Sequence, residues 1–287
     1  MLKQKKVLVT GAAGFTGRHL VRLLSKDASL SLFLAGFALR KETTQYPCDF
    51  LDPVSVQKLV ADIRPDVVYH LIGSYTNDYD TDYASNVLST RNILDALRTS
   101  DTKTRVLLVG SCAEYGLPLD SQRGVSEEHS LRPVSMYGLM KLYQHDLMET
   151  YVRLYGMDIV AVRPFNLRGK GMLPALFIGK MEQEIQRYKR GEIREIVTGD
   201  LSVERDYIDI DEAIKYYSVV LEKGKCGETY NVGSGQAKPL RSILKDMLSA
   251  EGLSMDIVRE GRHDVRGKLV VPKIFADITK LRKLSNF

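Results

Sequence analysis

A glycine-rich turn directly after the first apolar run is the feature that most limits how this chain can fold. The run KVLVT (6–10) is followed by GAAGFTG, which places Gly11, Gly14 and Gly17 three residues apart. Glycines at this spacing, after a strand and at the start of a helix, allow a tight turn and close approach of backbone N–H groups to a phosphate. The motif therefore predicts a first βα unit that binds the pyrophosphate of a dinucleotide.

Apolar runs and helical patterns alternate through the first two thirds of the chain. The expected strands are 6–10, 30–37, 66–73, 105–111 and 157–165. The expected helices are 18–26, 54–63, 85–99 and a long one that runs from 137 to about 155. Strands that are apolar throughout and separated by helices form a parallel sheet covered on both faces. The pattern predicts a doubly wound α/β fold.

The alternation ends near residue 166, and a later run, ETYNVGSG (228–235), has the pattern of a strand that returns to the sheet. No repeat or low-complexity stretch interrupts the chain. We therefore expect two parts, a Rossmann domain and a smaller, discontinuous α+β lobe. The domain covers 1–165 and is rejoined by about 207–235, and the lobe is built from 166–206 and 236–287.

Composition narrows the class of function. The 287 residues contain no run of eighteen apolar residues, and the start MLKQKKVLVTGAAG lacks a secretory signal, so we expect a cytoplasmic protein without a membrane span. Cys48, Cys112 and Cys226 have no CxxC spacing, so we expect free thiols and no metal site. The net charge of +5 comes from scattered basic residues, which argues against nucleic acid and suits an anionic small molecule.

The segment after the second expected strand bears on the choice of cofactor. An acidic residue usually ends this strand in NAD-binding domains, but AGFALRKE has no acid before Glu42 and carries Arg40 and Lys41. We expect NADPH, held through its 2′-phosphate, with NADH as the alternative if these are ordinary solvated loop charges. Asp49 is placed either to accept a hydrogen bond from the adenine amino group or as a plain turn residue.

A tyrosine and a lysine four residues apart, in SMYGLMK (135–141), are candidates for proton transfer. Residues at this spacing share one face of a helix, and an ammonium close to a phenol lowers its pKa. Many surface helices carry such a pair, so the spacing of Tyr137 and Lys141 does not by itself establish catalysis.

Several motifs in one order resemble the extended short-chain dehydrogenase/reductases that act on nucleotide-diphosphate sugars. These motifs are TGAAGFTG, HLIG (70–73), Asn86 in SNVLSTRN, GSCAEYG (110–116), YGLMK (137–141), RPFN (163–166), RDYIDIDE (205–212) and YNVGSG (230–235). The resemblance implies that Tyr137 transfers a proton, that Lys141 lowers its pKa and binds the nicotinamide ribose, and that Ser111 binds the carbonyl oxygen. Ser135 is an alternative for the last role, but Ser111 is favoured because it lies at the end of an expected strand and Ser135 does not.

The resemblance also implies two sets of binding residues. Cofactor contacts are expected from Gly11, Gly14, Phe15, Thr16, Gly17, Arg40, Asp49, Phe50, Leu51, Leu71, Gly73, Asn86, Tyr137, Lys141 and Pro164. Substrate contacts are expected from Cys112, Glu114, Asn166, Lys180, Arg205 and Arg262, with the arginines on the diphosphate. Lys180 is alternatively a helix surface charge, and Arg205 and Arg262 alternatively form salt bridges to Asp206 and Asp264.

The residues after Ser111 separate the reactions found in this family. Sugar dehydratases of this family carry an acidic pair, or a serine and a glutamate, at the next two positions. This chain has Cys112 and Ala113 there, and Glu114 comes one place too late. The reductases that also epimerise carry a cysteine where this chain has Ala113, together with a histidine in the lobe. No histidine occurs between His145 and His263. Redox chemistry at a single carbon remains.

The lobe segments 166–185 and 199–212 resemble those of enzymes that act on GDP-4-keto-6-deoxymannose. We therefore expect NADPH-dependent reduction of the C4 ketone of a GDP-4-keto-6-deoxy-sugar. The alternatives are an NAD-dependent nucleotide-sugar 4-epimerase or dehydrogenase, and a non-catalytic NADPH-binding relative. The resemblance also implies a homodimer in which the helices near 86–99 and 137–155 form a four-helix bundle.

Overall fold

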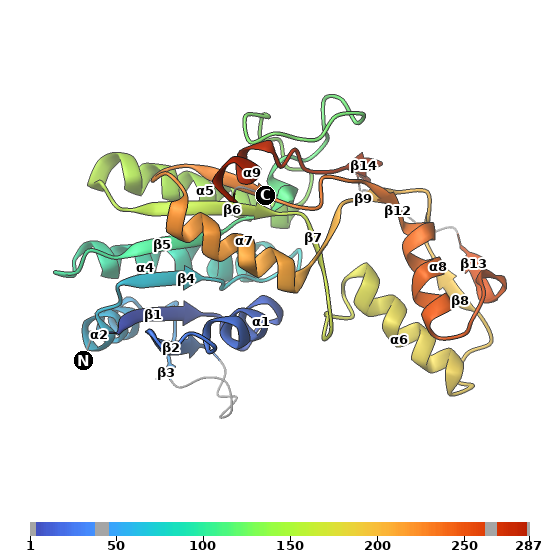
Figure 1. Cartoon of the computed structure of the whole chain (residues 1–287), viewed down its shortest axis with the longest axis horizontal. Coiled ribbons are helices and arrows are strands. Elements are labelled where there is room, and N and C mark those ends of the chain that lie inside the picture. The colour runs from blue at the N-terminus through green and yellow to red at the C-terminus, as the bar shows by residue number, and fades with distance from the viewer. Residues whose placement is uncertain (1–3, 38–45, 262–268, 286–287) are drawn as a thin grey trace.

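A seven-stranded parallel sheet forms the centre of the protein (Figure 1). The computed structural model describes residues 4–37, 46–261 and 269–285. The strand order is β11-β6-β5-β4-β1-β2-β3, and every neighbouring pair is parallel. The strands are β1 (Lys5–Thr10), β2 (Leu30–Gly36), β3 (Tyr46–Pro47), β4 (Val67–His70), β5 (Arg105–Val109), β6 (Ile159–Pro164) and β11 (Thr229–Val232). The doubly wound fold predicted from the sequence is confirmed.

Helices cover both faces of this sheet, as the strands' continuous apolar character requires. One face carries α1 (Phe15–Leu24), α7 (Ile210–Lys223) and α9 (Thr279–Ser285). The other face carries α2 (Pro53–Ile63), α4 (Ser89–Arg98) and α5 (Met136–Tyr155). A short helix α3 (Tyr79–Tyr83) and a π-helical turn η1 (Ala84–Leu88) lead into α4, where the sequence predicts one continuous helix.

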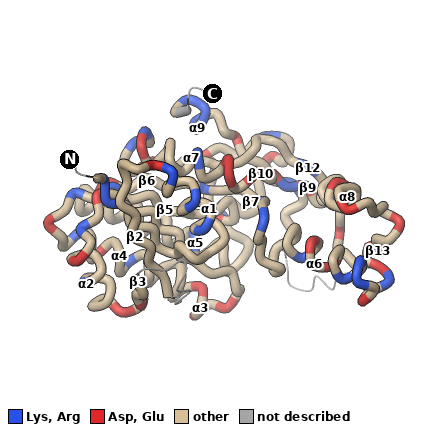
Figure 2. Tube along the Cα trace, turned by 60° about the horizontal axis from the view of Figure 1, so that its bottom comes forward, with Lys and Arg blue, Asp and Glu red and all other residues tan. Residues whose placement is uncertain are grey.

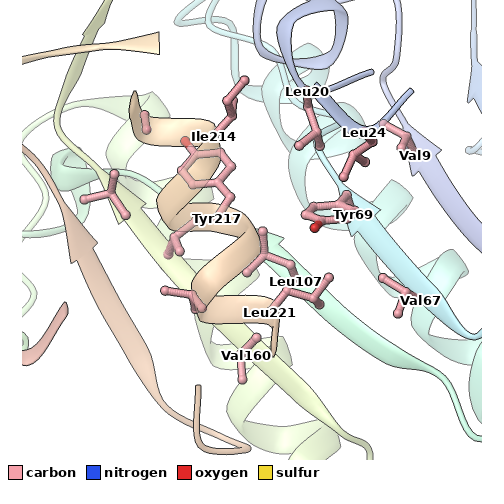
Figure 3. Close-up of a cluster of buried hydrophobic side chains, with 14 of the residues drawn as sticks. Val9, Leu20, Leu24, Val67, Tyr69, Leu107, Val160, Ile214, Tyr217 and Leu221 are labelled. Carbon is pink, nitrogen blue, oxygen red and sulfur yellow. The ribbon is translucent and has the colours of Figure 1, made fainter. Parts of the chain in front are cut away.

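Alternation along the strands builds two cores. In β1, Val7 and Val9 face α1 and α7, whereas Leu8 between them faces α2 and α4. Figure 3 shows the first core, in which Tyr217 and Leu221 of α7 lie over the sheet. These side chains are almost fully buried. Burial of one large apolar side chain stabilises the folded state by roughly 1.5–3 kcal/mol. The two cores hold the strand ends in fixed positions.

The lobe lies beyond the carboxyl ends of the strands (Figure 1). It contains α6 (Phe177–Lys189) and α8 (Leu240–Ala250), which share a core with the strand pair β8 (Ile196–Thr198) and β13 (Val258–Glu260). Three short elements, β12 (Lys238–Pro239), β9 (Glu204–Arg205) and β14 (Lys273–Ile274), connect it to the domain, as does the pair β7 (Asn166–Arg168) and β10 (Tyr207–Asp209). Basic and acidic residues are interspersed along the whole trace (Figure 2).

The C-terminal helix departs from the division expected from the sequence. Leu281 of α9 belongs to the core formed by α1, α7 and the sheet, so this end of the chain packs on the domain and not in the lobe. The sequence did not reveal this packing, because α9 spans only seven residues and is too short to show a helical pattern of apolar residues. Within the described ranges, no helix is long and apolar enough to cross a membrane.

Asp206 joins the lobe to the domain. Its carboxylate is fully buried and accepts hydrogen bonds from the backbone N–H groups of Ser234, Gly235 and Ala276 at 2.7–3.0 Å, and from the Ser234 hydroxyl at 2.6 Å. These donors follow β11 and β14, so a single side chain ties three distant segments together.

We predict that Asp206→Ala lowers the free energy of unfolding by at least about 3 kcal/mol, because it leaves several buried N–H groups without an acceptor. Urea denaturation measures this change. Asp200→Ala is the control, since Asp200 also accepts from a serine N–H and hydroxyl but is exposed. Equal effects of the two substitutions would contradict the structural role given to Asp206.

Candidate active site

Ser111, Tyr137 and Lys141 lie together at the carboxyl edge of the sheet. Ser111 follows β5 and caps the 3-10 turn η2 (Cys112–Glu114), while the other two lie in the first two turns of α5. The Ser111 side chain is hydrogen-bonded to Tyr137. The competing serine, Ser135, is the N-cap of α5 and accepts from Gly138 N at 3.0 Å. The geometry therefore favours Ser111 as the partner of the tyrosine.

Ser111 is held from behind by a buried ion pair. One Glu114 oxygen accepts from Ser111 N at 2.7 Å, and the other lies 2.6 Å from Nε of Arg163 on β6. Both charged side chains are almost completely buried. With both oxygens engaged, Glu114 is not free to bind substrate, which goes against the expectation from sequence. It positions Ser111 instead.

The electrostatics of Tyr137 differ from the expectation that Lys141 lowers its pKa. Burial raises the Tyr137 pKa above its usual value, and the hydrogen bond from Ser111 opposes this only in part. The Lys141 ammonium lies 5.9 Å from the centroid of the tyrosine ring and is engaged elsewhere. In this state Tyr137 is a protonated phenol, ready to donate.

Two buried acceptors hold the Lys141 ammonium. Its Nζ donates to the Val109 carbonyl at 3.0 Å and to Gln144 Oε1 at 2.9 Å. Burial lowers the Lys141 pKa to about 8, while the charges of Glu114 and Asp82 oppose this shift. One N–H of the ammonium is left for a further acceptor.

A polar chain behind the lysine fixes the direction in which Gln144 points. Thr90 donates its only proton to the Asn86 carbonyl at 2.6 Å, so its oxygen accepts from Gln144 Nε2 at 2.8 Å and from His70 Nε2 at 3.1 Å. Burial lowers the His70 pKa to about 3, so this ring is neutral and its Nδ1 accepts from Thr10 at 2.9 Å. Gln144 must therefore present its carbonyl oxygen to the lysine.

The glycine turn and Asn86 fit a dinucleotide. Gly11 has φ +69°, and a Cβ at Gly17 would lie 2.3 Å from the Gly11 carbonyl oxygen, so the turn tolerates no side chain there. Asn86 is fully buried, and its Oδ1 has no partner while Nδ2 donates to the carbonyls of Ser74 and Asp82. A Cβ on Gly73 would meet this Oδ1 at 2.6 Å, so the glycine lets the Asn86 amide pack directly against the chain just after β4.

The other expected cofactor residues have mixed positions. Phe15 and Thr16 begin α1, Leu71 follows β4, and Pro164 ends β6, all at the carboxyl edge of the sheet. Asp49 accepts from Leu51 N at 2.9 Å, which is the turn role considered as its alternative. Phe50 is fully buried edge-on against Phe37, whereas Leu51 is exposed. Arg40 lies outside the described residues.

Arg205 lies close to Cys112, the neighbour of Ser111, and has no carboxylate partner among the described residues. Its Nη1 donates to the Glu204 carbonyl at 2.8 Å, and burial lowers its pKa. The expected alternative, a salt bridge to Asp206, is not formed, because that carboxylate binds backbone N–H groups. A partly desolvated guanidinium in this position suits a phosphate.

The remaining expected substrate residues lie at different depths. Burial raises the Cys112 pKa to about 12, so the group is a thiol and packs against a small apolar cluster. Asn166 donates to the Asp206 carbonyl at 3.2 Å, and Lys180 is exposed on α6. Arg262 lies outside the described residues.

Among the described residues, no group of three or more histidine, cysteine or acidic side chains is placed to hold a metal.

Two residues near the tyrosine and lysine were not singled out from the sequence, although Tyr75 falls in a stretch (74–83) that the sequence predicts to line the pocket. Gln144 lies three positions after Lys141 on the same helix, a spacing that could have indicated contact. The Tyr75 ring lies edge-on to that of Tyr137, with centroids 5.0 Å apart, and no local pattern indicates this.

The buried ammonium makes stability depend on pH. Because the Lys141 pKa falls from 10.5 to about 8 on folding, the unfolded chain binds more protons between these values, and the wild type gains stability as pH rises through them. Lys141→Met lacks this gain. We predict that the difference in free energy of unfolding, wild type minus variant, rises by about 3 kcal/mol across the window in urea denaturation. A constant difference would contradict a buried charged lysine.

Two curated relatives resemble the whole chain. GDP-6-deoxy-D-mannose reductase of Pseudomonas aeruginosa is 29% identical over 262 residues, which cover 89% of this chain and 83% of the relative. GDP-6-deoxy-D-talose 4-dehydrogenase of Aggregatibacter actinomycetemcomitans is 26% identical over 283 residues, which cover 96% and 90%.

Solved structures share the fold. RMD from Pseudomonas aeruginosa, complexed with NADPH, has a TM-score of 0.86 at 25% identity and covers 99% of this chain and 91% of its own. UDP-glucose 4-epimerase from Thermotoga maritima, solved with UDP-glucose, has a TM-score of 0.85 at 22% identity, covering 98% and 92%; this likeness concerns the fold. The model of the NAD dependent epimerase/dehydratase family matches residues 7–233, and the chain therefore belongs to that family.

Proposed function

We propose that this protein reduces the C4 ketone of a GDP-4-keto-6-deoxy-sugar, such as GDP-4-keto-6-deoxy-D-mannose, with NADPH. The observation that carries the proposal is that, among the described residues, neither the carboxylate nor the thiol close to Tyr137 is available as a second acid or base. Glu114 is tied to Arg163 and Ser111, and the Cys112 pKa is raised to about 12. Dehydration and 3,5-epimerisation both need such a group, whereas ketone reduction needs one proton donor. The two GDP-sugar relatives support the nucleotide.

The proton comes from Tyr137, whose raised pKa keeps the phenol protonated until charge develops on the ketone oxygen. NADPH, when bound, supplies the hydride, and the structure of RMD with NADPH supports that cofactor. The Ser111 oxygen accepts from Ala113 N at 3.1 Å, and its one proton, which is directed at Tyr137 in this structure, turns to the same ketone oxygen when the substrate binds. Lys141 offers its remaining N–H to a ribose hydroxyl and restrains the cofactor beside the tyrosine.

The diphosphate binds between the domain and the lobe in this proposal. Arg205, Asn166 and Lys180 supply its contacts from β9, β7 and α6, and Arg205 is the strongest candidate because its guanidinium is half-buried and unpaired with any carboxylate in the described part of the chain. In the same proposal, the sheet domain holds the dinucleotide. Two copies of the chain associate through a surface formed by α4 and α5.

The alternative is a 4-epimerase or a dehydrogenase acting in the oxidative direction. The same serine, tyrosine and lysine serve either direction of hydride transfer, and one relative is a 4-dehydrogenase. A reductase consumes one NADPH per product, whereas an epimerase regenerates its cofactor, so net consumption of cofactor separates them.

The test follows loss of NADPH absorbance with GDP-4-keto-6-deoxy-D-mannose generated in place by a dehydratase. We predict steady turnover that falls at least about 1,000-fold in Tyr137→Phe, because the proton donor is lost while the ring remains. The dehydratase alone and the variant serve as controls. Turnover that persists in the variant would contradict the role of Tyr137.

A second prediction concerns the diphosphate. Arg205→Ala should raise KM for the nucleotide sugar at least about tenfold and change kcat far less, because it removes binding shared by substrate and transition state. Arg259→Ala is the matched control, since its exposed guanidinium in the same lobe is already paired with Glu195 at 2.7 Å. A loss confined to kcat would contradict this placement of Arg205.

A further inference from the structure

The loop that follows β4 is organised around a buried carboxylate. Asp82, on α3, has no accessible surface and accepts from the Ser74 hydroxyl at 2.6 Å, the Thr76 hydroxyl at 2.9 Å, Thr76 N at 3.0 Å and Asn77 N at 2.9 Å. Burial would raise the Asp82 pKa, but these hydrogen bonds outweigh it and the pKa lies below its usual value. The carboxylate therefore stays charged and the loop keeps one shape.

The backbone of the loop is adapted to that shape. Asn77 has φ +61°, a left-handed conformation that asparagine tolerates better than most residues. The two amide hydrogens of Asn86 are donated to the carbonyls of Ser74 and Asp82, which joins the loop to the π-helical turn η1 that precedes α4. Tyr75 lies between these fixed points, so its position is set by its neighbours on both sides.

The Tyr75 side chain extends from this hydrogen-bonded loop to the ring of Tyr137. Its ring meets the Tyr137 ring edge-on at 88°, with centroids 5.0 Å apart, yet 49% of the residue is exposed. An aromatic residue held by its neighbours and half open to solvent offers a ready-made apolar wall. Nothing in the reduction mechanism uses this wall.

We infer that Tyr75 forms one wall of the sugar subsite and contacts the sugar ring of the nucleotide sugar next to the reacting carbon. The inference rests on the proposed function, since the ketone oxygen must lie within hydrogen-bonding reach of the Tyr137 hydroxyl. A pyranose placed there extends past the edge of the Tyr137 ring, where Tyr75 lies. The C–H face of a pyranose and the methyl group of a 6-deoxy-sugar both pack well on an aromatic ring.

The neighbouring Tyr79 provides a matched control. It is 47% exposed, almost the same as Tyr75, and belongs to the adjoining helix α3. Its ring stacks on Tyr83 with centroids 5.8 Å apart and not on Tyr137. A substitution at Tyr79 therefore alters a similar surface without altering the wall beside the catalytic tyrosine.

The first measurement is kinetic. Tyr75→Ala should raise KM for the keto-sugar about tenfold and leave the dissociation constant of NADPH unchanged, whereas Tyr79→Ala should change neither. A rise in the NADPH dissociation constant with KM unchanged would overturn the assignment and place Tyr75 against the cofactor. Equal effects of the two substitutions would overturn it as well.

The second measurement does not need turnover. The chain contains no tryptophan, so Tyr75→Trp and Tyr79→Trp each introduce a single tryptophan, which is excited at wavelengths where the tyrosines do not absorb. Each variant, saturated with NADP+, is titrated with GDP-mannose, UDP-glucose or dTDP-glucose, and binding is measured independently by equilibrium dialysis. We expect GDP-mannose to bind both variants and to change the emission only of the tryptophan at position 75.

The outcomes separate this inference from the proposed function. Binding of GDP-mannose without a change at position 75, or a change caused by NADP+ alone, overturns the assignment of Tyr75 and leaves the proposed function standing. A response to UDP-glucose or dTDP-glucose without binding of GDP-mannose supports Tyr75 as a sugar wall and contradicts the proposed nucleotide. Failure of all three to bind overturns both.

Discussion

The buried ion pair between Glu114 and Arg163 is the interaction on which the rest of the site depends. It joins the turn after β5 to β6, and through Ser111 N it fixes the residue that faces Tyr137. Two charges almost without solvent are stable only as a pair, and removal of one partner typically costs about 3–5 kcal/mol. The pair also keeps Glu114 away from the substrate, so the element that orders the site also restricts its chemistry to one proton donor.

Buried hydrogen bonds also fix the position of Lys141 and the shape of the loop after β4. A chain of buried polar groups from Thr10 to Gln144 points one acceptor at Lys141, and Asp82 shapes the loop that carries Tyr75. The polar chain starts at the end of β1, and the loop follows the end of β4. Parallel pairing brings these strand ends to one edge of the sheet. Because these hydrogen bonds form within the chain itself, the lysine and Tyr75 are positioned before any ligand arrives.

The sequence predicted what short-range patterns determine. Continuous apolar strands, helical periodicity and the glycine turn gave the doubly wound fold, and the spacing of Tyr137 and Lys141 brought out the candidate proton donor. Contacts between distant residues left no such signal. Glu114 meets Arg163 across 49 positions, and Gln144 meets Thr90 across 54, so neither partner was predicted. The return of α9 to the domain rests on two leucines, Leu281 and Leu284, in a helix of seven residues that is too short to show a periodic pattern.

The central claim is net transfer of hydride from the nicotinamide to C4 of a GDP-linked keto-sugar. The most direct measurement uses NADPH deuterated at the nicotinamide C4, with the product analysed by NMR and mass spectrometry. We expect one deuterium at C4 of the sugar for each NADPH oxidised when the label occupies the transferred position. Product that contains no deuterium with either C4-labelled form of NADPH, or a sugar epimerised at C4 without oxidation of NADPH, would contradict net hydride transfer to C4.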